Sequence, residues 1–426
     1  MKTNSRTYDL IVIGGGPSGM MAAGRAAELG ARVLILEKNK QLGRKLLLTG
    51  GGRCNITKAI FDVRKFLENF PETKNFLYSP FSKFSVKETF DFFEKRRLPL
   101  IIEAKDRAFP KGEQSTDVLV ALERYMKENN VEIKKETKVT SLKQKTNGTW
   151  EVKTKEMEFG AQNVALATGG LALPETGSTG DGFKMLEKLG HKTGFFSPNL
   201  VPLKVKEDWV HSLSGVTLSF MTIGFIQDKK LKFKKRGKIL FTHFGVSGPL
   251  ILNSSFEVTK LLKKGQVYAS IDMFPDTEEQ TLEHTVFKLF EKNKNKKIKN
   301  VLPEILPGAV SEEILKFKDI DLSEREVNSI TKEERKALVK KLKNLTFEIT
   351  GTLGFEKAIA SIGGVSPREI NFKNMTSNLF DNLYLLGDII DINRPSGGFS
   401  LQLCWTTGWV AGTDVGKKVQ GNISVV

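Results

Sequence analysis

The strongest chemical signal in the sequence is a glycine motif near its start. Residues 14–19 read Gly-Gly-Gly-Pro-Ser-Gly and fit the pattern G-x-G-x-x-G. In this pattern Gly14 permits a tight turn from strand to helix, Gly16 lets the backbone approach a pyrophosphate, and Gly19 allows the helix to pack closely on the strand. The helix N-terminus then offers N–H groups and a favourable dipole to the phosphates. The motif predicts a dinucleotide site; the alternative is a glycine-rich turn without a ligand.

An acidic residue at a suitable distance supports the dinucleotide interpretation. Glu37 lies 18 residues after Gly19, at the end of the next predicted strand. There it can accept hydrogen bonds from the hydroxyl groups of an adenosine ribose. A carboxylate at this point disfavours a 2′-phosphate, and therefore NADP. Both NAD and FAD remain compatible with the motif.

Glycines later in the chain favour FAD. The sequence ATGG at 167–170 ends one predicted strand, and Gly387-Asp388 end another near the C-terminus. These are the second and third contacts expected of an FAD fold, in which Asp388 bonds a ribityl hydroxyl or reaches the pyrophosphate through water. Residues 397–399, Gly-Gly-Phe, then open a final helix whose positive end would face the flavin and stabilise its anionic reduced form. The two ends of the chain are therefore predicted to form one FAD-binding Rossmann-type domain.

A further loop carries three consecutive glycines between basic residues. The segment GRKLLLTGGGRCNIT covers residues 43–57. Glycines in this setting indicate backbone that passes very close to a flat or anionic group.

Three side chains are candidates for chemistry on the substrate side. Cys54 could donate a proton to a substrate that receives hydride, although a small buried filler is the plainer interpretation. His243 could orient substrate or be a hydrogen-bonded structural histidine. Arg394, just before the glycines at 397–398, could bind an anion at the mouth of the site, whereas Cys404 on the last helix is assigned to packing.

The source of electrons is predicted by what the sequence lacks. A second G-x-G-x-x-G is absent, so NAD(P)H would visit the flavin transiently and leave. A C-x-x-C pair is absent as well, which argues against disulfide reduction. His191, His211 and His284 show no mutual ligand spacing, so no metal is predicted.

The elements that must position these groups follow from the hydrophobic pattern. Apolar strands are expected at 8–13, 32–37 and 163–168, with helices at 20–29 and 117–130 and mainly helical structure over 60–135. From residue 194 strand-like segments predict an antiparallel barrel or sheet. The expected domains are a FAD-binding first part (1–193), a β-barrel-like insertion (194–276), a helical insertion (277–345), a return of the barrel (346–362) and a FAD-binding second part (363–426).

Composition sets the broad class. Of the 426 residues, 39% are hydrophobic and 27% are charged, as in a globular protein, and no apolar run is long enough for a membrane helix. No signal peptide is recognisable at the start. The two cysteines cannot form a disulfide framework, which predicts a reducing cytoplasm.

The charge is unusually positive for a metabolic enzyme. Sixty-six Lys and Arg against 49 Asp and Glu give a net charge of +17. Clusters lie at 228–238, 292–299 and 332–344, all inside the inserted domains. Solvated faces and AT-biased coding explain part of this excess. Basic modules that cover a flavin would also suit folded RNA as substrate.

Long blocks of the chain resemble the BaiN-like (YhiN-like) flavoproteins, a family of NAD(P)/FAD-dependent oxidoreductases. The matching blocks are GRKLLLTGGGRCN (43–55), ATGGLALPETGSTGDG (167–182), FTHFGVSGP (241–249), GGVSPREIN (363–371) and LGDIIDINRPSGGFSLQLCWTTGWVAG (386–412). The resemblance implies a FAD domain interrupted by a β-barrel-like domain and a small helical domain. Residues 104–119 and 361–362 depart from the family pattern, on what is expected to be the substrate side.

The resemblance also implies which residues lie around the cofactor, with Val139 meeting adenine through its backbone. Motifs and resemblance together give this predicted cofactor-binding set: Gly14, Gly16, Pro17, Ser18, Gly19, Glu37, Lys38, Arg44, Lys45, Leu46, Gly51, Gly52, Arg53, Asn55, Val139, Thr168, Gly169, Gly170, Gly387, Asp388, Gly397, Gly398 and Phe399.

The family resemblance supports two substrates, because its members are linked to dihydrouridine formation in large-subunit ribosomal RNA and to reduction of small unsaturated molecules. The leading prediction is an FAD-dependent reductase of uridine in ribosomal RNA with NAD(P)H as electron source. The target base would be splayed or flipped onto the flavin. The alternatives are an oxidoreductase of a small unsaturated metabolite and a non-catalytic FAD-containing RNA-binding or assembly protein.

Overall fold

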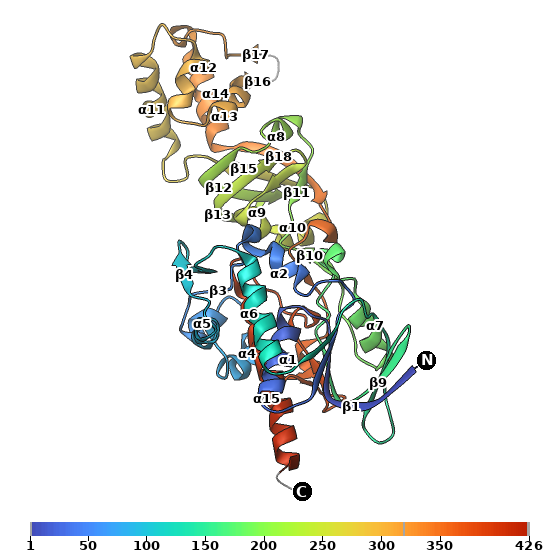
Figure 1. Ribbon diagram of the computed structural model, residues 1–426. Coiled ribbons are helices and arrows are strands. Elements are labelled where there is room, and N and C mark those ends of the chain that lie inside the picture. Colours follow the sequence, from blue (N-terminus) through green and yellow to red (C-terminus); the bar gives the residue numbers. More distant parts are fainter. Residues whose placement is uncertain (1, 318–319, 424–426) are drawn as a thin grey trace. The chain divides into compact units, whose positions relative to one another are not determined.

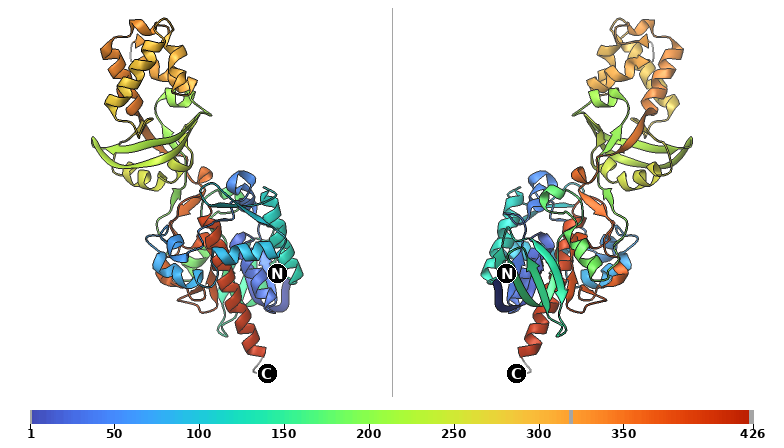
Figure 2. Two further views of the ribbon diagram at one scale, coloured as in Figure 1. Left: turned by 90° about the vertical axis from the view of Figure 1, so that its left-hand side faces the viewer. Right: turned by 90° about the vertical axis from the view of Figure 1, so that its right-hand side faces the viewer.

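A computed structural model describes residues 2–317 and 320–423 of the chain. The chain divides into two compact units (Figures 1 and 2). The first unit joins the residues up to Pro198 with those from Ile359 onward, and the second comprises Asn199–Ala358. Both ends of the sequence therefore belong to the same unit.

A largely parallel sheet forms the centre of the first unit. The central strand β1 pairs in parallel with β2 on one side and with β9 on the other, and β9 in turn pairs in parallel with β22 from the C-terminal part. Apolar side chains cover both faces, as expected of a buried parallel strand such as Leu10–Ile13. The strands, in sheet order, are β20 (Ile370–Asn371), β21 (Thr376–Ser377), β22 (Leu383–Leu385), β9 (Met157–Leu166), β1 (Lys2–Ile13), β2 (Val33–Leu36) and β6 (Glu132–Lys134), with β8 (Trp150–Thr154) and β7 (Val139–Gln144) attached to β9.

The first and last helices pack closely against each other beside this sheet. Helix α15 (Phe399–Ile423) places Gly408, Gly412 and Gly416 against α1 (Pro17–Glu28). A Cβ at Gly412 would lie 2.5 Å from the carbonyl oxygen of Ala22, so only glycine lets the two backbones come this close. The contact between the glycines of α15 and helix α1 joins the two ends of the sequence into one fold.

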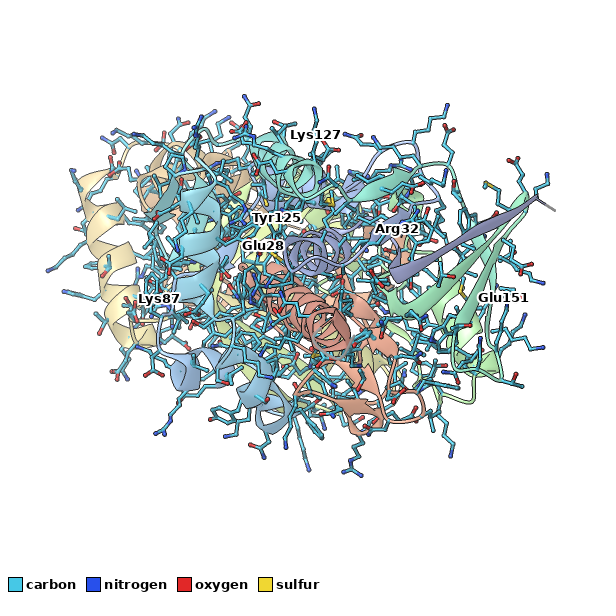
Figure 3. All side chains as sticks on the ribbon, turned by 60° about the horizontal axis from the view of Figure 1, so that its bottom comes forward. Glu28, Arg32, Lys87, Tyr125, Lys127 and Glu151 are labelled. Carbon is cyan, nitrogen blue, oxygen red and sulfur yellow. The ribbon has the colours of Figure 1, made fainter. Side chains whose placement is uncertain are left out.

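Polar contacts tie the far ends of these helices to α5 (Val86–Lys95) and α6 (Ser115–Glu128). The Tyr125 hydroxyl donates to Glu28 Oε2 at 2.8 Å, and Figure 3 shows these two side chains beside each other. Arg25 also bonds Glu28, at 2.6 Å, while Arg96 lies over the Tyr125 ring at 4.0 Å. The cluster fixes the end of the unit opposite to the carboxyl ends of the strands.

The region 60–135 is less helical than predicted. The region contributes β4 and β5 to a small antiparallel sheet in the order β3–β5–β4, and it also contains β6 of the main sheet. Strands β4 and β5 have four residues each, and neither alternates between buried and exposed positions, which explains why the sequence pattern missed them. The remaining elements of this unit are α2 (Arg44–Leu48), β3 (Thr57–Lys58), α3 (Val63–Leu67), α4 (Lys74–Phe81), β4 (Leu100–Glu103), β5 (Arg107–Pro110), α7 (Asp181–Lys188), β10 (Ser197–Asn199) and β19 (Ala360–Ile362).

The second unit contains a closed six-stranded antiparallel barrel, as the strand-like segments after residue 194 predicted. Its longest strands form a hairpin through Asp228 and Lys229, whose φ angles of 53° and 59° suit a two-residue turn. The barrel strands, in order, are β11 (Leu203–Val205), β14 (Gly245–Ser247), β13 (Lys230–Thr242), β12 (Thr217–Gln227), β15 (Val267–Asp272) and β18 (Leu345–Thr352). The short helices of this part are α8 (Asp208–Ser212), α9 (Pro249–Leu252) and α10 (Ser255–Leu262).

Helices between β15 and β18 extend the same hydrophobic core. The amide of Met273 donates to the carbonyl of Leu342 at 3.1 Å, and Lys343 pairs with Asp272 at 2.7 Å, which holds the helices at one end of the barrel (Figure 1). The elements are α11 (Glu279–Lys292), α12 (Ile298–Val301), α13 (Gly308–Leu315), β16 (Lys316–Phe317), β17 (Ile320–Asp321) and α14 (Lys332–Lys343).

Candidate active site

The predicted dinucleotide turn lies between β1 and α1. Gly14 has φ of 106°, and a Cβ there would lie 2.5 Å from the carbonyl oxygen of Ala167. Gly19 is equally confined, against the Gly14 carbonyl. Gly16 differs, because a Cβ there would meet no atom within 4 Å. The turn is therefore tightly packed at Gly14 and Gly19, whereas the backbone at Gly16 is open.

Helix α1 begins at this open backbone. Gly16 occupies its N-cap position without a side-chain cap, and Pro17 is its first residue. Because the first turn of a helix has N–H groups without partners in the helix, this end can bind an anion. The arrangement is that of a phosphate cradle.

Glu37 stands next to the turn at the end of β2. Its side chain is buried; Oε2 accepts from the Gly15 amide at 2.7 Å, and Oε1 accepts from both nitrogens of Asn39 at 2.8 Å. The carboxylate is therefore fixed, and Oε2, which accepts one hydrogen bond from the protein, retains capacity to accept a further one.

The glycine loop at 50–52 combines positive φ angles with an open backbone at Gly51 and Gly52. Gly50, Gly51 and Gly52 have φ of 60°, 69° and 86°, and Cβ atoms at Gly51 and Gly52 would meet nothing within 4 Å. Cys54 follows with φ of 60° and a completely buried side chain. Burial raises the pKa of its thiol to about 12, only partly offset by a hydrogen bond with Thr49. Cys54 therefore keeps its proton at neutral pH.

Arg53 in this loop is held by two carboxylates. Its Nη2 donates to Glu103 of β4 and, at 2.8 Å, to Glu113, while the guanidinium lies 4.3 Å from the centre of the Phe109 ring. These hydrogen bonds raise the pKa of Arg53 and lower that of Glu103. Neither acid was singled out from the sequence. They lie in or beside the stretch that departs from the family pattern.

The turn after β9 brings further polar groups to the same region. Lys45 donates to Ser178 Oγ at 2.7 Å, and a Cβ at Gly169 would lie 2.9 Å from that oxygen. Burial lowers the pKa of Lys45, while the nearby Asp388 carboxylate opposes this shift. Lys45, Gly169 and Asp388, distant in sequence, are therefore neighbours in the first unit.

Arg394 is buried, whereas the sequence predicted it at the mouth of the site. It is 4% exposed, Nε donates to Ser400 Oγ at 3.0 Å, Nη1 donates to the Ile392 carbonyl at 2.6 Å, and Nη2 pairs with Asp388. All of its nitrogens are used inside the protein. This geometry gives Arg394 the role of holding Asp388.

The N-terminus of α15 completes the region. Gly397 has φ of 110° and an open Cβ position, whereas a Cβ at Gly398 would lie 2.4 Å from the backbone carbon of Thr57 in β3. Phe399 packs on Phe66 at 5.1 Å between ring centres. The helix therefore begins at a firmly anchored point with open backbone beside it.

Other predicted residues have structural partners. Lys38 pairs with Asp181 at 2.6 Å; burial disfavours the Asp181 carboxylate, but hydrogen bonds from Lys38, Thr179 and Lys138 outweigh this and lower its pKa. Arg44 donates to Asn39 Oδ1 at 3.1 Å, and Leu46 and Val139 are buried. His243 belongs to the second unit, where it is exposed in the β13–β14 turn with its ring edge-to-face on Phe244.

Two buried polar atoms test whether the region suits a dinucleotide cofactor. Asn55 Oδ1 and Thr168 Oγ1 in this region belong to the five buried side-chain nitrogen and oxygen atoms that lack a hydrogen-bond partner within the described residues. Buried polar groups normally have partners, so both atoms call for a polar ligand. Together with the open backbones at Gly16, Gly51 and Gly397, they fit a flat, phosphate-bearing molecule such as FAD.

The described residues form neither a metal cluster nor a membrane-spanning helix. Residues 2–317 and 320–423 contain no group of three or more His, Cys, Asp and Glu side chains that could hold a metal ion. Among the helices in these ranges, none combines the length and apolar character needed to cross a membrane.

Comparisons with solved structures show the fold. The chain is similar to the 3-ketosteroid Δ1-dehydrogenase of Sterolibacterium denitrificans, with a TM-score of 0.55 at 12% identity over 97% of this chain and 100% of the other. It is also similar to the FrdA subunit of Escherichia coli quinol fumarate reductase, with a TM-score of 0.54 at 13% identity over 99% and 72%. These values establish the α/β FAD-binding Rossmann-type fold with its barrel insertion.

Sequence comparisons give the family. A 3-dehydro-bile acid Δ4,6-reductase of Clostridium scindens is 30% identical over 96% of this chain and 98% of its own length. A ribosomal RNA dihydrouridine synthase of Escherichia coli is 26% identical over 96% and 98%. The model of the HI0933-like protein Rossmann domain matches residues 8–414. The chain therefore belongs to the HI0933-like family, and is an FAD-dependent oxidoreductase.

Proposed function

We propose that this protein reduces uridine to dihydrouridine in ribosomal RNA, with NAD(P)H as the electron source. One observation carries the choice of substrate: a row of cations on β13. Lys234, Arg236 and Lys238 alternate along the strand and are exposed, on the face opposite to α9 and α10. We call these three residues the basic row.

The opposite face of β13 is defined by its contacts. Lys235 donates to the Asn253 carbonyl at 2.6 Å and to Glu257 of α10 at 3.0 Å, and Gly237 lies against Leu250 of α9. Side chains of a strand alternate between faces, so the even-numbered residues point away from these helices. Neighbours in the basic row are about 6.8 Å apart along the strand.

Two of the three cations are not neutralised by the protein. Arg236 forms a two-pronged ion pair with Asp276, whereas no ion pair of Lys234 or Lys238 is found among the described residues. Most lysines of the cluster at 292–299 differ in this respect: Lys297 and Lys299 share Glu324, and Lys294 pairs with Glu291. The surplus of basic over acidic residues per residue is similar in the two units. The position of unpaired charge, rather than its total, therefore supports a polyanionic partner.

The first unit supplies the chemistry. Bound FAD would supply hydride to C6 of uracil, and C5 would then take a proton. Gly16 and the start of α1 would bind the pyrophosphate, Glu37 the adenosine ribose, and Asp388 the ribityl chain. Asn55 and Thr168 would direct their unpartnered oxygens to the cofactor. The backbone of 51–52 and the N-terminus of α15 would lie against the ring, where positive dipole favours negative charge.

Cys54 does not suit the part of proton donor. Its side chain is completely buried, bonds Thr49 and has a pKa of about 12. A thiol with this pKa gives up a proton reluctantly at neutral pH. We therefore assign Cys54 to packing under the glycine loop and leave protonation of C5 to a group that the substrate complex brings into place.

Mass spectrometry of ribosomal RNA tests the proposal. Deleting the gene should lower the mass of one RNA fragment by 2 Da, and expression of the wild-type chain should restore it. A Gly16→Val chain, in which the cradle is filled, should be produced but should not restore the mass. An unchanged mass in the deletion strain would reject RNA as substrate.

The second candidate function is reduction of a small unsaturated metabolite. It is favoured by the bile acid reductase, which is more similar to this chain, at 30% identity, than the E. coli dihydrouridine synthase, at 26%. It predicts unchanged ribosomal RNA together with rapid reoxidation of reduced enzyme by an unsaturated ketone. A non-catalytic RNA-binding protein would instead keep its flavin absorbance after addition of NADH or NADPH.

A further inference from the structure

Phe220 has an environment that its residue type does not explain. It lies inside β12, yet its side chain is 73% exposed. Its φ of 65° places it in the left-handed region, which bulky L-residues avoid. Burial does not hold the ring in this position, so a contact outside the unit is the simplest reason for an aromatic residue there.

A β-bulge directs Phe220 toward the basic row. Leu218 pairs with Ile239 and Met221 pairs with Gly237, so that Ser219 and Phe220 both oppose the single residue Lys238. A bulge of this kind re-aims side chains. The register therefore places Phe220 across from the row residue Lys238, and both residues are exposed.

A second exposed apolar residue lies at the other end of this face. Leu231 is 58% exposed, and a Cβ at Gly224 would lie 2.9 Å from its Cδ1. Gly224 pairs with Lys234, so Leu231 reaches over the strand beside that lysine. The face thus presents one aromatic ring, unpaired cations and one aliphatic side chain in sequence.

This combination matches single-stranded nucleic acid better than other partners. An aromatic ring offers a stacking surface to any base, and lysines beside it can contact the flanking phosphates. A membrane-binding surface would need a larger apolar area, and a stable protein interface would need a wider apolar centre.

We propose that Phe220 stacks an unpaired base of the RNA substrate while Lys238 and Lys234 contact the neighbouring phosphates. The inference rests on the proposed function and adds a docking residue to it. It also accounts for the backbone conformation, because the bulge exposes a ring that the barrel itself does not use.

The strained backbone gives the inference a distinctive signature. Replacing Phe220 by glycine relieves the left-handed conformation and removes little buried surface. Phe220→Gly should therefore raise the unfolding midpoint of the second unit by about 2 °C while weakening RNA binding. Phe220→Ala keeps the strained φ, so it should weaken binding without the increase in stability.

The test is fluorescence anisotropy of the FAD-loaded chain with a labelled RNA hairpin of about 20 nucleotides, whose loop is uridine-rich, and with a fully paired duplex of the same length. Phe220→Ala should bind the hairpin about tenfold more weakly, with unchanged salt dependence and unchanged duplex binding. Phe220→Trp should retain hairpin binding. Phe61→Ala, at a half-exposed phenylalanine of the first unit, is the matched control and should behave as wild type.

The outcomes separate failure of the docking residue from failure of the proposed function. Wild-type chain that fails to bind either RNA would overturn both together. Hairpin binding that Phe220→Ala leaves unchanged would overturn the docking residue alone. If Phe220→Ala instead lost binding to vesicles of phosphatidylglycerol and phosphatidylcholine while RNA binding stayed intact, the face would be reassigned to membranes.

Discussion

The turn at residues 14–19 and the bulge at 219–220 both depart from regular backbone geometry, but they do so with different residues. In the first unit the unusual conformations are mostly supplied by glycine, as at Gly14 and Gly397, which adopts positive φ at little cost. At the barrel bulge the positive φ falls on Phe220, a bulky residue. The first region offers bare backbone; the second offers a side chain.

This difference indicates two kinds of recognition. A cofactor cradle made of backbone depends on the absence of side chains, so a single added group should abolish binding. A surface made of separate side chains divides its free energy among them, so each substitution should cause a graded loss. Variants of the two regions should therefore differ in the form of their response as well as in its size.

The largest effect is expected from Gly16→Val. A Cβ at Gly16 meets no protein atom within 4 Å, so the chain should fold, but the new side chain occupies the phosphate cradle. The purified protein should be colourless and should take up no FAD, as measured by its absorbance in the visible flavin band. Gly351→Val in the barrel, where a Cβ also meets nothing within 4 Å, is the control and should remain yellow. A yellow Gly16→Val protein would contradict the backbone-cradle model.

The next effect tests the joint between the two ends of the chain. In Gly412→Val the new Cβ would lie 2.8 Å from Arg25 Cβ and still closer to backbone of α1. Overpacking of this kind costs about 1–3 kcal/mol or more, so the first unit should unfold several degrees lower in a thermal scan. In Gly421→Ala, on the same helix, the new side chain enters open space. Alanine is more favourable than glycine in a helix by up to roughly 1 kcal/mol, so the midpoint should rise slightly. Equal effects of the two would show that α1 and α15 do not pack as described.

A graded effect is expected from Lys234→Ala combined with Lys238→Ala. If each lysine contacts one phosphate of single-stranded RNA, the double variant should reduce the slope of log K against log salt by about 1.4. FAD content should stay the same. Lys65→Ala combined with Lys127→Ala removes the same charge from exposed sites of the first unit and should leave the slope unchanged. Equal losses from both pairs would mean that net charge, rather than the basic row, attracts RNA.

The sequence predicted the glycine turn at 14–19 better than the bulge at 219–220, for a physical reason. Glycine motifs report local geometry, so the order of residues alone places 14–19 and 397–399 at strand ends and helix starts. Alternation in residues 230–238 likewise predicted a strand. The bulge at Phe220 depends on the register between two strands, which the pattern of one strand does not contain.

Long-range pairs were equally beyond local patterns. Arg53 was predicted to contact the cofactor, but no local pattern indicated that Glu103 and Glu113 would hold its guanidinium. The short strands β4 and β5 that position Glu103 were expected to be helical or loop. Similarly, Arg394 was expected at the mouth of the site, and its burial follows from hydrogen bonds that only the folded turn after β22 creates.

The smallest effect concerns that Arg53 clamp, and it separates the two modes of recognition within the first unit itself. The glycine loop is backbone, but Glu103 fixes its neighbour Arg53 through a side chain, so the response should be graded. Hydrogen bonding to Arg53 lowers the pKa of Glu103 below its ordinary value. The stabilisation is therefore present above the unfolded-state pKa, about 4.3, and is lost as pH falls through the lower folded-state value.

Glu103→Gln should release FAD a few-fold faster at pH 7, measured by recovery of flavin fluorescence. It should also flatten the increase in release that the wild-type chain shows below about pH 4. Glu113→Gln, at a more exposed carboxylate, should have the smaller effect at both pH values. If Glu103→Gln instead abolished FAD binding outright, the loop would depend on this side chain as strictly as the cradle depends on Gly16, and the contrast between backbone and side-chain sites would fail inside the first unit.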